Sequence, residues 1–457
     1  MKNFKENIYK ICPYWIQNIL ISFYGKRIIR ERYGKIYFDE LNRLMNRDYS
    51  DYNEEISHQT NELIRFIKFA VNKSPFYQEI YEGIDLNKIK TVDDLKLLPI
   101  VSKEDLRANI NRVYTLDEDD AIVSFTGGTT GKSLKVFATK EDMQKRMAYL
   151  DAFKIRAGVT NLMTARKATF SGRQLIKANE KKRFWRYNKP YNQKLYSTFH
   201  LNENNMVKYI ENLNKFKPEI INGFVSAIYD IAQYLDRKNI VLEFVPKAIF
   251  TTSESLLNYH RELIEHTFKA KIYNQYASAE GAPFITECRE GNLHYNLDTG
   301  VIEQTNISGK KAEDMIVTSF TTHGTPLIRY NIKDRVIFKE GFCNCGSSHP
   351  LVKSIEGRQV DYLTAVDGTK VSLSHLADVI KGIPNSIKKI QFIQRERSEL
   401  EILLVLDERL YTKKDELKLR ESIKYRFGKE IRISMKIVED IPREKSGKYS
   451  LIKNFLK

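Results

Sequence analysis

The sequence predicts an α/β protein with a large N-terminal domain, made of mostly parallel sheets flanked by helices plus a small β region, and a small C-terminal α+β domain. Strands and helices alternate from residue 120 to about 270, which is typical of a parallel sheet with helices on its faces. From 290 to 356 the pattern changes to short strands and turns, and a compact strand–helix–strand piece follows. We therefore expect domains at 1–356 and 357–457.

Individual segments carry this prediction. Strands are expected at 120–125, 219–224, 247–252, 271–276, 301–303, 315–320, 399–406 and 430–438, and helices at 57–72, 140–153, 226–235, 258–268 and 412–427. Two further helix starts, at Val92 and Ser102, have the residues of N-terminal caps. Ligands of parallel sheets bind beyond the carboxyl ends of the strands. Those ends here carry Gly223, Thr252-Ser253-Glu254 and Tyr276.

Composition narrows the class of protein. Of the 457 residues 42% are hydrophobic and 29% charged, as in a globular protein with a large core. The net charge of +17 would attract nucleotides, coenzyme A, an acidic carrier protein or an anionic membrane. No basic block with interleaved aromatic residues is present, so we expect no nucleic-acid partner. Four cysteines are too few for a disulfide framework, which predicts a reducing cytoplasm.

The N-terminal residues 1–70 are predicted to form a basic helical extension, and we expect no secretory signal in them. Trp15 to Tyr24 is apolar but contains three polar residues, and it is too short to span a bilayer. Two interpretations stay open for this stretch. One is a helix packed on the protein, and the other is a helix on a membrane surface, with Lys26 and Arg27 following it.

The first predicted strand, 120–125, is expected to be buried, and a glycine-rich stretch, Ser124-Phe-Thr-Gly-Gly-Thr-Thr-Gly-Lys132, follows it. Glycines let backbone N–H groups approach a ligand, threonines add hydroxyl donors and Lys132 adds a positive charge, so the stretch is suited to phosphate. It is not a Walker loop, because that motif needs its first glycine where Thr126 stands. Taken alone, it also fits a simple turn between a strand and a helix.

Five stretches, in this order, resemble motifs of the adenylate-forming (acyl/aryl-CoA ligase) superfamily. They are the loop at 124–132, Tyr276-Ala-Ser-Ala-Glu280, Pro326 to Asp334, Gly357-Arg358 and Pro442-Arg-Glu-Lys-Ser-Gly-Lys448. The stretch from His58 to Lys103, with Ser74-Pro75-Phe76-Tyr77 and Leu98-Pro99, is similar to the phenylacetate–CoA ligase and capsular polysaccharide biosynthesis CapK branch. The resemblance covers nearly the whole chain and implies that the C-terminal domain is mobile and rotates between two half-reactions.

The resemblance also implies roles for individual residues. Glu280 would hold Mg²⁺, and Lys448 would bridge the carboxylate and the α-phosphate during adenylation. ATP or AMP would contact the residues of the loop and of the later motifs: Thr126, Gly127, Gly128, Thr129, Thr130, Gly131, Lys132, Ser253, Glu254, Asn274, Gln275, Tyr276, Ala277, Asp334 and Arg358. Among these, Tyr276 would stack on adenine and Asp334 would accept the ribose hydroxyls. The carboxylic acid would lie near Gly223, Phe224 and Thr252.

The implied reaction is ATP-dependent activation of a small carboxylic acid as acyl-AMP, with release of pyrophosphate, followed by transfer to coenzyme A. One alternative is an acyl-AMP-forming enzyme of capsular or cell-surface polysaccharide synthesis that uses another thiol or an amine as acceptor. Another is a non-catalytic basic binding protein on a degenerate ligase fold, because the chain departs from the family at Gly127, Ala277 and 331–333. Separately, the family's hinge residue has no clear match at 359–361.

A separate set of residues could hold a metal within the β region predicted at 285–350. Cys288 and His294 are six residues apart, and Cys343 and Cys345 follow as a Cys-x-Cys pair. Three thiolates and one imidazole fill a closed, tetrahedral structural Zn²⁺ site. Some members of the phenylacetate ligase-like branch have a zinc of this kind. Three reduced thiols and an ordinary histidine are the alternative.

Overall fold

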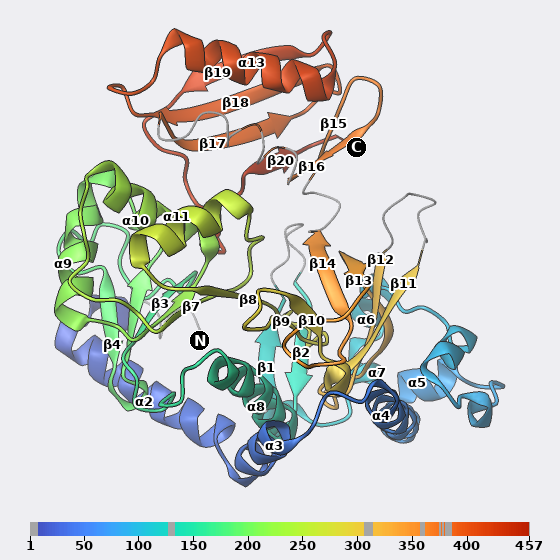
Figure 1. Ribbon diagram of the computed structural model, residues 1–457. Helices are drawn as coiled ribbons and strands as arrows, with labels where there is room; N and C mark the ends of the chain where they lie inside the picture. The colour runs from blue at the N-terminus through green and yellow to red at the C-terminus, as the bar shows by residue number, and fades with distance from the viewer. Residues whose placement is uncertain are drawn as a thin grey trace. The chain divides into compact units, whose positions relative to one another are not determined.

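The computed structural model describes residues 8–126, 133–305, 314–356, 362–373, 376, 379 and 386–456. These residues form a mixed α/β structure (Figure 1), as the sequence predicted. The chain divides into two compact units, one of 1–21, 165–272 and 357–457 and the other of 22–164 and 273–356. Neither follows the predicted domains, whose boundary at 356/357 stays a prediction.

The first unit contains a mostly parallel sheet, as predicted, but of its strands only β6 and β7 were among those expected. Strands β3, β5, β6 and β7 run parallel in the order β5-β3-β6-β7, and β4 pairs antiparallel with β5. The strands of this sheet are β3 (Lys167–Ser171), β4 (Trp185–Asn188), β5 (Gln193–Ser197), β6 (Ile220–Gly223) and β7 (Ala248–Thr251). The helices between them are α9 (Met206–Phe216), α10 (Val225–Arg237) and α11 (Asn258–Phe268). Buried Tyr209, Ile228 and Phe268 from these helices join the same core as Phe170 and Ile249 of the strands, as expected for helices that cover a sheet.

The C-terminal segment of this unit has a small core of its own. A four-stranded sheet in the order β19-β18-β17-β20 is accompanied by helix α13 (Figure 1), and a hairpin of β15 and β16 precedes it. The bounds are β15 (Tyr362–Thr364), β16 (Lys370–Ser372), β17 (Ile387–Gln394), β18 (Glu399–Leu406), α13 (Lys413–Phe427), β19 (Arg432–Ile437) and β20 (Ile452–Asn454). Leu419, Ile423 and Phe427 of α13 are fully buried against Phe392 and Ile402. This helical spacing explains why α13 buries one face on the sheet.

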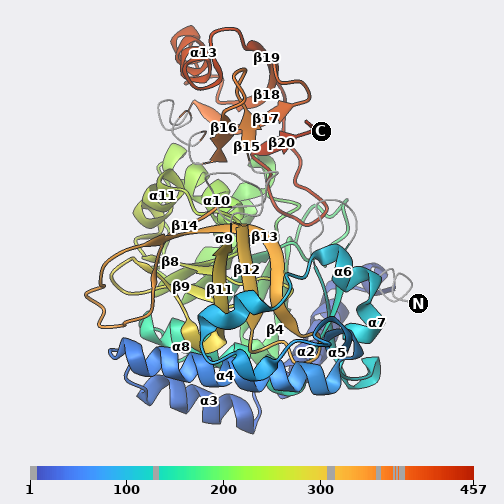
Figure 2. The ribbon, with the colours of Figure 1, turned by 90° about the vertical axis from the view of Figure 1, so that its right-hand side faces the viewer.

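The second unit combines helices with a largely antiparallel sheet. Its strands follow the order β11-β12-β13-β14-β10-β9-β8. Their bounds are β8 (Ile272–Tyr276), β9 (Ile285–Glu287), β10 (Leu293–Tyr295), β11 (Gly300–Thr305), β12 (Asp314–Ser319), β13 (Leu327–Lys339) and β14 (Leu351–Glu356). Helix α4 (Tyr52–Lys73), whose first turn is capped by Asp51, lies across one end of strands β11 to β13 (Figure 2). Its Leu63, Phe66 and Ile67 share a core with Met315 and Val317.

Further helices of the described residues precede β3 in the sequence. They are α2 (Tyr14–Arg32), α3 (Lys35–Asn46), α5 (Pro75–Ile80), α6 (Lys103–Ala108), α7 (Ile110–Val113) and α8 (Lys140–Arg156). The predicted cap before α6 is present, because the Ser102 hydroxyl accepts from the N–H of Asp105. No helix that the structure describes combines the length and the apolar composition needed to cross a membrane.

The surroundings of the glycine-rich loop differ from the prediction in two ways. The strand before it, β1 (Ile122–Phe125), is half-buried to exposed, not buried, because among the described residues it pairs with β2 (Lys135–Ala138) alone, in a two-stranded ribbon. Strand β2 was missed: it stands between the loop and helix α8, so the loop connects two antiparallel strands instead of a strand and a helix. Its four residues are too few to show a clear period of two.

Candidate active site

Tyr276 and Asp334 lie in contact in the second unit. Tyr276 is the last residue of β8, and Asp334 lies on β13, 58 residues later. The tyrosine hydroxyl donates a hydrogen bond of 2.7 Å to Oδ2 of Asp334, and both side chains are half-buried. The sheet thus brings two of the predicted motifs together and places an aromatic ring beside a carboxylate.

Glu280 follows in a tight turn after β8. The hydroxyl of Ser278 accepts from the N–H groups of Gly281 and Ala282, at 3.1 and 2.9 Å, and Gly281 has a positive φ of 103°. This turn directs the Glu280 carboxylate inward, where the residue is 5% exposed. A buried carboxylate needs a positive partner to remain ionised.

That partner is Lys103, the first residue of α6, which sequence reasoning did not place in the site. Its ammonium group lies 3.3 Å from Oε1 of Glu280 and donates to the Thr126 hydroxyl at 3.1 Å. The Glu280 carboxylate and the Thr126 hydroxyl oxygen therefore both contact the Lys103 ammonium group. The only sequence signal for Lys103 was its place at the end of the similar stretch from His58 to Lys103.

The same oxygens fit a divalent cation. Mg²⁺ prefers oxygen ligands, and the Lys103 ammonium marks a place where a hydroxyl and a carboxylate already stabilise positive charge. Thr126 also closes the β1–β2 hairpin: its N–H donates to the carbonyl of Leu134 at 3.0 Å, and its hydroxyl accepts from the N–H of Leu134 at 2.9 Å. The predicted phosphate-binding residues 127–132 and Arg358 lie outside the described residues.

Arg146 of α8 supports the Glu280 turn from inside the protein. Its guanidinium donates to the Gly281 carbonyl and to the Thr321 hydroxyl, both at 2.9 Å, and it lies 4.3 Å from the ring centre of Phe284. Burial lowers the pKa of Arg146 to about 10, so the group keeps its charge at neutral pH. Nothing in the sequence distinguished this arginine from the other basic residues.

Asn274 and Gln275 lie on β8, and Ala277 directly follows that strand. The N–H of Asn274 donates to Glu287 at 2.8 Å, and Gln275 pairs with Thr286 of β9. Oε1 of Gln275 is buried and has no hydrogen-bond partner among the described residues. An unpaired buried acceptor is costly, so this side chain is a reasonable candidate to contact a ligand.

In the first unit, the predicted acid-binding residues lie at the carboxyl ends of β6 and β7, as expected. The N–H of Thr252 donates to the Gly223 carbonyl at 3.1 Å, and Phe224 is buried. A Cβ at Gly223 would lie 2.2 Å from the carbonyl oxygen of Phe170, so only glycine fits. Ser253 has a φ of 69°, which is strained for a residue with a side chain and is typical of functional sites.

Glu254 binds protein groups in this unit. Its carboxylate accepts from the N–H and hydroxyl of Ser226, at 2.8 and 3.0 Å, and from the N–H of Tyr449 at 3.0 Å. Burial raises the pKa of Glu254, and the charge of Arg443 partly opposes this rise. Because Tyr449 follows Lys448, this carboxylate holds the backbone next to the candidate catalytic lysine.

Arg443 and a pair of glycines further hold the Lys448 loop. Arg443 donates to the Ser226 hydroxyl at 2.7 Å and forms an ion pair of 2.6 Å with Asp230. A Cβ at Gly172 would overlap the carbonyl oxygen of Ser446, and Gly447 has a φ of 80°, so both positions require glycine. Lys448 itself is half-buried. Sequence reasoning missed Arg443 and Asp230 as partners.

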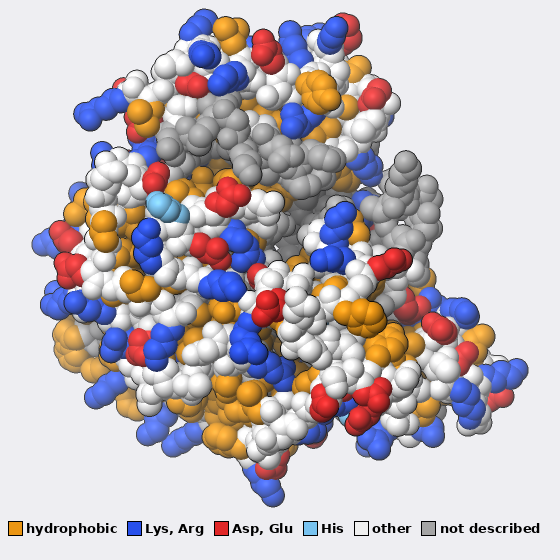
Figure 3. Space-filling view, in the orientation of Figure 1, with side chains coloured by type: hydrophobic (Ala, Val, Ile, Leu, Met, Phe, Trp, Pro, Cys, Tyr) orange, Lys and Arg blue, Asp and Glu red, His pale blue; other side chains and the backbone are white. Residues whose placement is uncertain are grey.

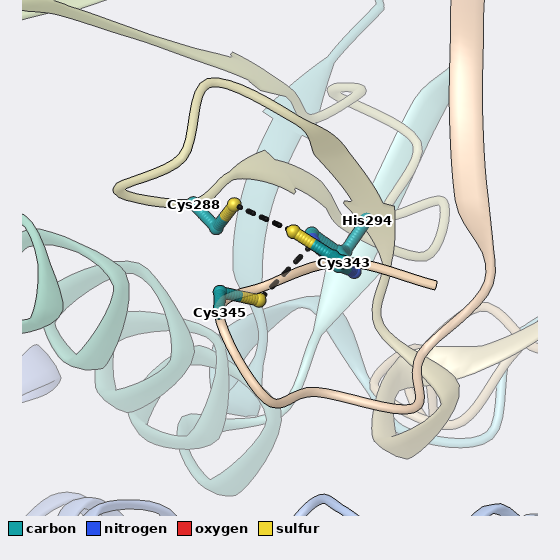
Figure 4. A group of neighbouring side chains, drawn as sticks. All are labelled: Cys288, His294, Cys343 and Cys345. Carbon is teal, nitrogen blue, oxygen red and sulfur yellow. Dashed lines mark hydrogen bonds between the residues drawn. The ribbon is translucent and has the colours of Figure 1, made fainter. Parts of the chain in front are cut away.

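The predicted metal ligands form a cluster in the second unit. Figure 4 shows the side chains of Cys288, His294, Cys343 and Cys345 converging from β10 and two loops. Their ligand atoms all lie within 4.8 Å of one another, with 3.6 Å between the sulfurs of Cys288 and Cys343 and 3.5 Å from Cys345 to Nε2 of His294. Ligands about 2.3 Å from a tetrahedral Zn²⁺ would be about 3.8 Å apart, so the geometry fits zinc.

Surrounding groups orient the His294 ring and raise the pKa of the Cys345 thiol in this cluster. Nδ1 of His294 lies 3.0 Å from the carbonyl of His349, which leaves Nε2 toward the thiols, as a zinc ligand needs. Burial raises the pKa of the Cys345 thiol to about 12, and the nearby thiols Cys343 and Cys288 add to this effect. Without a cation the Cys345 thiol therefore stays protonated at neutral pH, and Zn²⁺ would supply the charge that stabilises its thiolate.

Known proteins resemble the chain over three quarters of its length or more. Protein CapK of Staphylococcus aureus is 36% identical over 453 residues, which cover 98% of this chain and 99% of CapK. The chain belongs to the CapK family. A model of the CapK C-terminal domain matches residues 363–455 of this CapK-family protein. Phenylacetate-coenzyme A ligase of Thermus thermophilus is 23% identical over 371 residues, 75% of this chain and 79% of that enzyme.

Solved structures agree on the fold. A crystal structure of 2-hydroxyisobutyryl-CoA ligase in the postadenylation state, in complex with R3-HIB-AMP, matches with a TM-score of 0.69 and 15% identity, covering 90% of this chain and 91% of the ligase. The same ligase in complex with 2-HIB-AMP and CoA, in the thioesterification state, matches with a TM-score of 0.55 and 16% identity, covering 91% and 92%. The CapK-family chain thus has the fold of the adenylate-forming CoA ligases.

Proposed function

We propose that this CapK-family protein activates a small carboxylic acid as acyl-AMP and transfers the acyl group to coenzyme A. The observation that carries the proposal is the contact of Tyr276 with Asp334, because it joins the two motifs that would hold adenine and ribose. The relatives support it, since one is named a CoA ligase and the structural neighbours are CoA ligases crystallised with acyl-AMP ligands.

In the first half-reaction, a carboxylate oxygen attacks the α-phosphorus of ATP, and the bond from that phosphorus to the oxygen bridging to the β-phosphate breaks. Acyl-AMP and pyrophosphate result. Two anions must be held together, so positive charge and fixed donors are the main requirement. Glu280 and Thr126 would hold Mg²⁺, which would neutralise the triphosphate. Lys103 would then be released from Glu280 to contact a phosphate oxygen.

In the second half-reaction, the sulfur of coenzyme A attacks the acyl carbon and its thiol proton passes to solvent. The thioester bond forms as the bond from the acyl carbon to the phosphate oxygen breaks, and AMP leaves with that electron pair. Lys448 would act in the first step, where its ammonium stabilises charge on the reacting carboxylate and the α-phosphate.

We propose the cytoplasm as the compartment, because Cys288, Cys343 and Cys345 can serve as metal ligands only when reduced.

A screen of carboxylic acids tests the proposal. Purified protein is incubated with ATP, Mg²⁺ and one acid at a time, with and without coenzyme A, and AMP, acyl-AMP and acyl-CoA are quantified by mass spectrometry. We expect acyl-AMP with the correct acid alone and acyl-CoA with AMP when coenzyme A is added. If no acid yields acyl-AMP although AMP binds, the degenerate binding protein is the better account.

A non-CoA acceptor is the second candidate. It is favoured by the higher identity to protein CapK, 36% against 23% to phenylacetate-coenzyme A ligase, because the CapK branch is associated with capsular polysaccharide biosynthesis. The same screen separates the two. Acyl-AMP that accumulates undiminished in the presence of coenzyme A, and is consumed when another thiol or an amine sugar is added, would favour the second candidate.

A further inference from the structure

Helix α2 faces the protein with polar contacts. Its inward positions Gln17, Ile21 and Gly25 are buried, and Ile21 is the one large apolar side chain among them. The Gln17 amide donates to the carbonyls of Tyr9 and Cys12, both at 3.0 Å, and its oxygen accepts from Nε of Arg186 on β4. Asn18 accepts from the N–H of Tyr187 at 3.0 Å. Hydrogen bonds to β4 therefore fix which side of α2 points outward.

The outward side of α2 is apolar. Trp15, Ile19 and Phe23 are spaced by four residues, so they lie on one face of the helix, and they are 63%, 46% and 69% exposed. Leu20 and Tyr24 lie beside them and are also exposed. We call these five residues the α2 stripe. A surface helix normally buries its apolar face, and a row of exposed large apolar residues marks a binding surface.

Positive charge surrounds the α2 stripe. Residues 8–32 contain five basic side chains and one acidic side chain, Glu31, which is paired with Arg27 at 2.8 Å. The basic residues are Lys10, Lys26, Arg27, Arg30 and Arg32. In Figure 3 basic and hydrophobic side chains lie next to one another over the region where Figure 1 draws α2. The partner should therefore be both negatively charged and apolar.

A lipid surface combines these two properties. Tryptophan and tyrosine are preferred at the boundary between headgroups and acyl chains, and lysine and arginine attract anionic headgroups. A helix of 19 residues with large apolar side chains exposed along one face suits a flat partner. We propose that α2 binds the surface of an anionic membrane, parallel to its plane, with the α2 stripe inserted among the lipids. This inference is independent of the proposed reaction.

Vesicle binding by the full chain tests this proposal. We expect the protein to co-sediment with phosphatidylglycerol/phosphatidylcholine vesicles, less with phosphatidylcholine alone, and less as salt is raised. The chain has two tryptophans, so Trp185→Phe leaves Trp15 as the only reporter. Its fluorescence should shift to shorter wavelength when anionic vesicles are added. Trp15→Glu combined with Phe23→Glu should weaken vesicle binding at least tenfold.

Val241→Glu is the matched control, because Val241 is 82% exposed and lies away from α2 in the sequence, between α10 and β7. It should leave vesicle binding unchanged. The proposal is overturned if the folded wild type does not bind anionic vesicles at low salt, or if the double variant binds as wild type does. A concentration-dependent dimer that the double variant abolishes, without vesicle binding by wild type, would assign the α2 stripe to a second copy of the chain instead.

Discussion

The hydroxyl of Tyr276 donates a 2.7 Å hydrogen bond to the carboxylate of Asp334. In the proposed function Asp334 accepts the ribose hydroxyls directly, whereas the Tyr276 hydroxyl only orients it. Asp334→Ala should therefore weaken AMP binding at least tenfold. Tyr276→Phe keeps the ring and should weaken AMP binding less than Asp334→Ala does, since one neutral hydrogen bond contributes about 1 kcal/mol.

Calorimetric titration of AMP measures both effects, and Lys339→Ala at the end of β13 serves as control. Equal AMP affinity of Asp334→Ala and wild type would remove Asp334 from the nucleotide site.

Lys448→Ala should lower acyl-AMP formation by a factor on the order of 10², the size expected when one electrostatic stabiliser is removed. Lys445, exposed in the same loop, provides the matched control Lys445→Ala, which should retain wild-type rates. Pyrophosphate release measures both variants, and circular dichroism verifies that they are folded. Unchanged release by Lys448→Ala would show that the lysine has no part in adenylation.

The cluster of Cys288, His294, Cys343 and Cys345 should hold about one zinc per chain. Cys343→Ser and Cys345→Ser should each lose the metal and lower the melting temperature, because metal binding adds to folding stability. Cys12→Ser, outside the cluster, should do neither. Elemental analysis of protein prepared without chelator measures the zinc content. Zinc-free protein would contradict the metal site and show that the cluster consists of three reduced thiols and an ordinary histidine.

The fold was largely predictable because its segments follow clear periods and caps. Helix α11 has the predicted bounds, Asn258–Phe268, and the parallel strands β6 and β7 were found within one residue at each end. Strand β2 was missed because four residues carry too little pattern, and β1 was wrongly expected to be buried because burial depends on a partner that sequence does not show.

The candidate site was predictable where a motif marked it and not elsewhere. The thiols of Cys288 and Cys343 meet although 55 residues separate them, as the predicted ligand set of three cysteines and one histidine required. Arg443 and Asp230, 213 residues apart, could not be paired in advance, because the chain has 75 basic residues and 58 acidic residues. The pairing of Lys103 with Glu280 could not be predicted for the same reason. Pairing of common charged residues is decided by tertiary contacts alone.

Asp298 should make the stability of the protein depend on acid pH. It lies 2.6 Å from Arg47 and 3.3 Å from His58. Burial alone would raise the pKa of Asp298, but His58, Arg43 and Arg47 hold it well below its usual range. A lowered pKa in the folded state stabilises the protein above the unfolded value of about 3.9, and this contribution is lost as the pH falls below it.

Asp298→Asn should therefore lower the free energy of unfolding at pH 7 by about 3 kcal/mol, the cost of breaking a buried ion pair. Its stability should also fall less steeply than that of wild type between pH 5 and pH 3. Urea unfolding across this pH range measures both, with Asp39→Asn as an exposed control. Parallel pH profiles for Asp298→Asn and wild type would refute the assigned role.

Glu280 separates an enzyme from a binding protein with a degenerate fold, and its metal dependence tests the central claim most directly. Glu280→Gln keeps the shape of the side chain and removes the charge that would anchor Mg²⁺. The measurement is acid-dependent pyrophosphate release over a series of Mg²⁺ concentrations, for wild type and Glu280→Gln side by side. We predict that wild type releases pyrophosphate only with ATP, Mg²⁺ and the correct acid, and that Glu280→Gln is at least tenfold slower at limiting Mg²⁺. Turnover of Glu280→Gln at the wild-type rate under limiting Mg²⁺ would contradict the metal role of Glu280, and absence of acid-dependent release by wild type would contradict the enzyme itself.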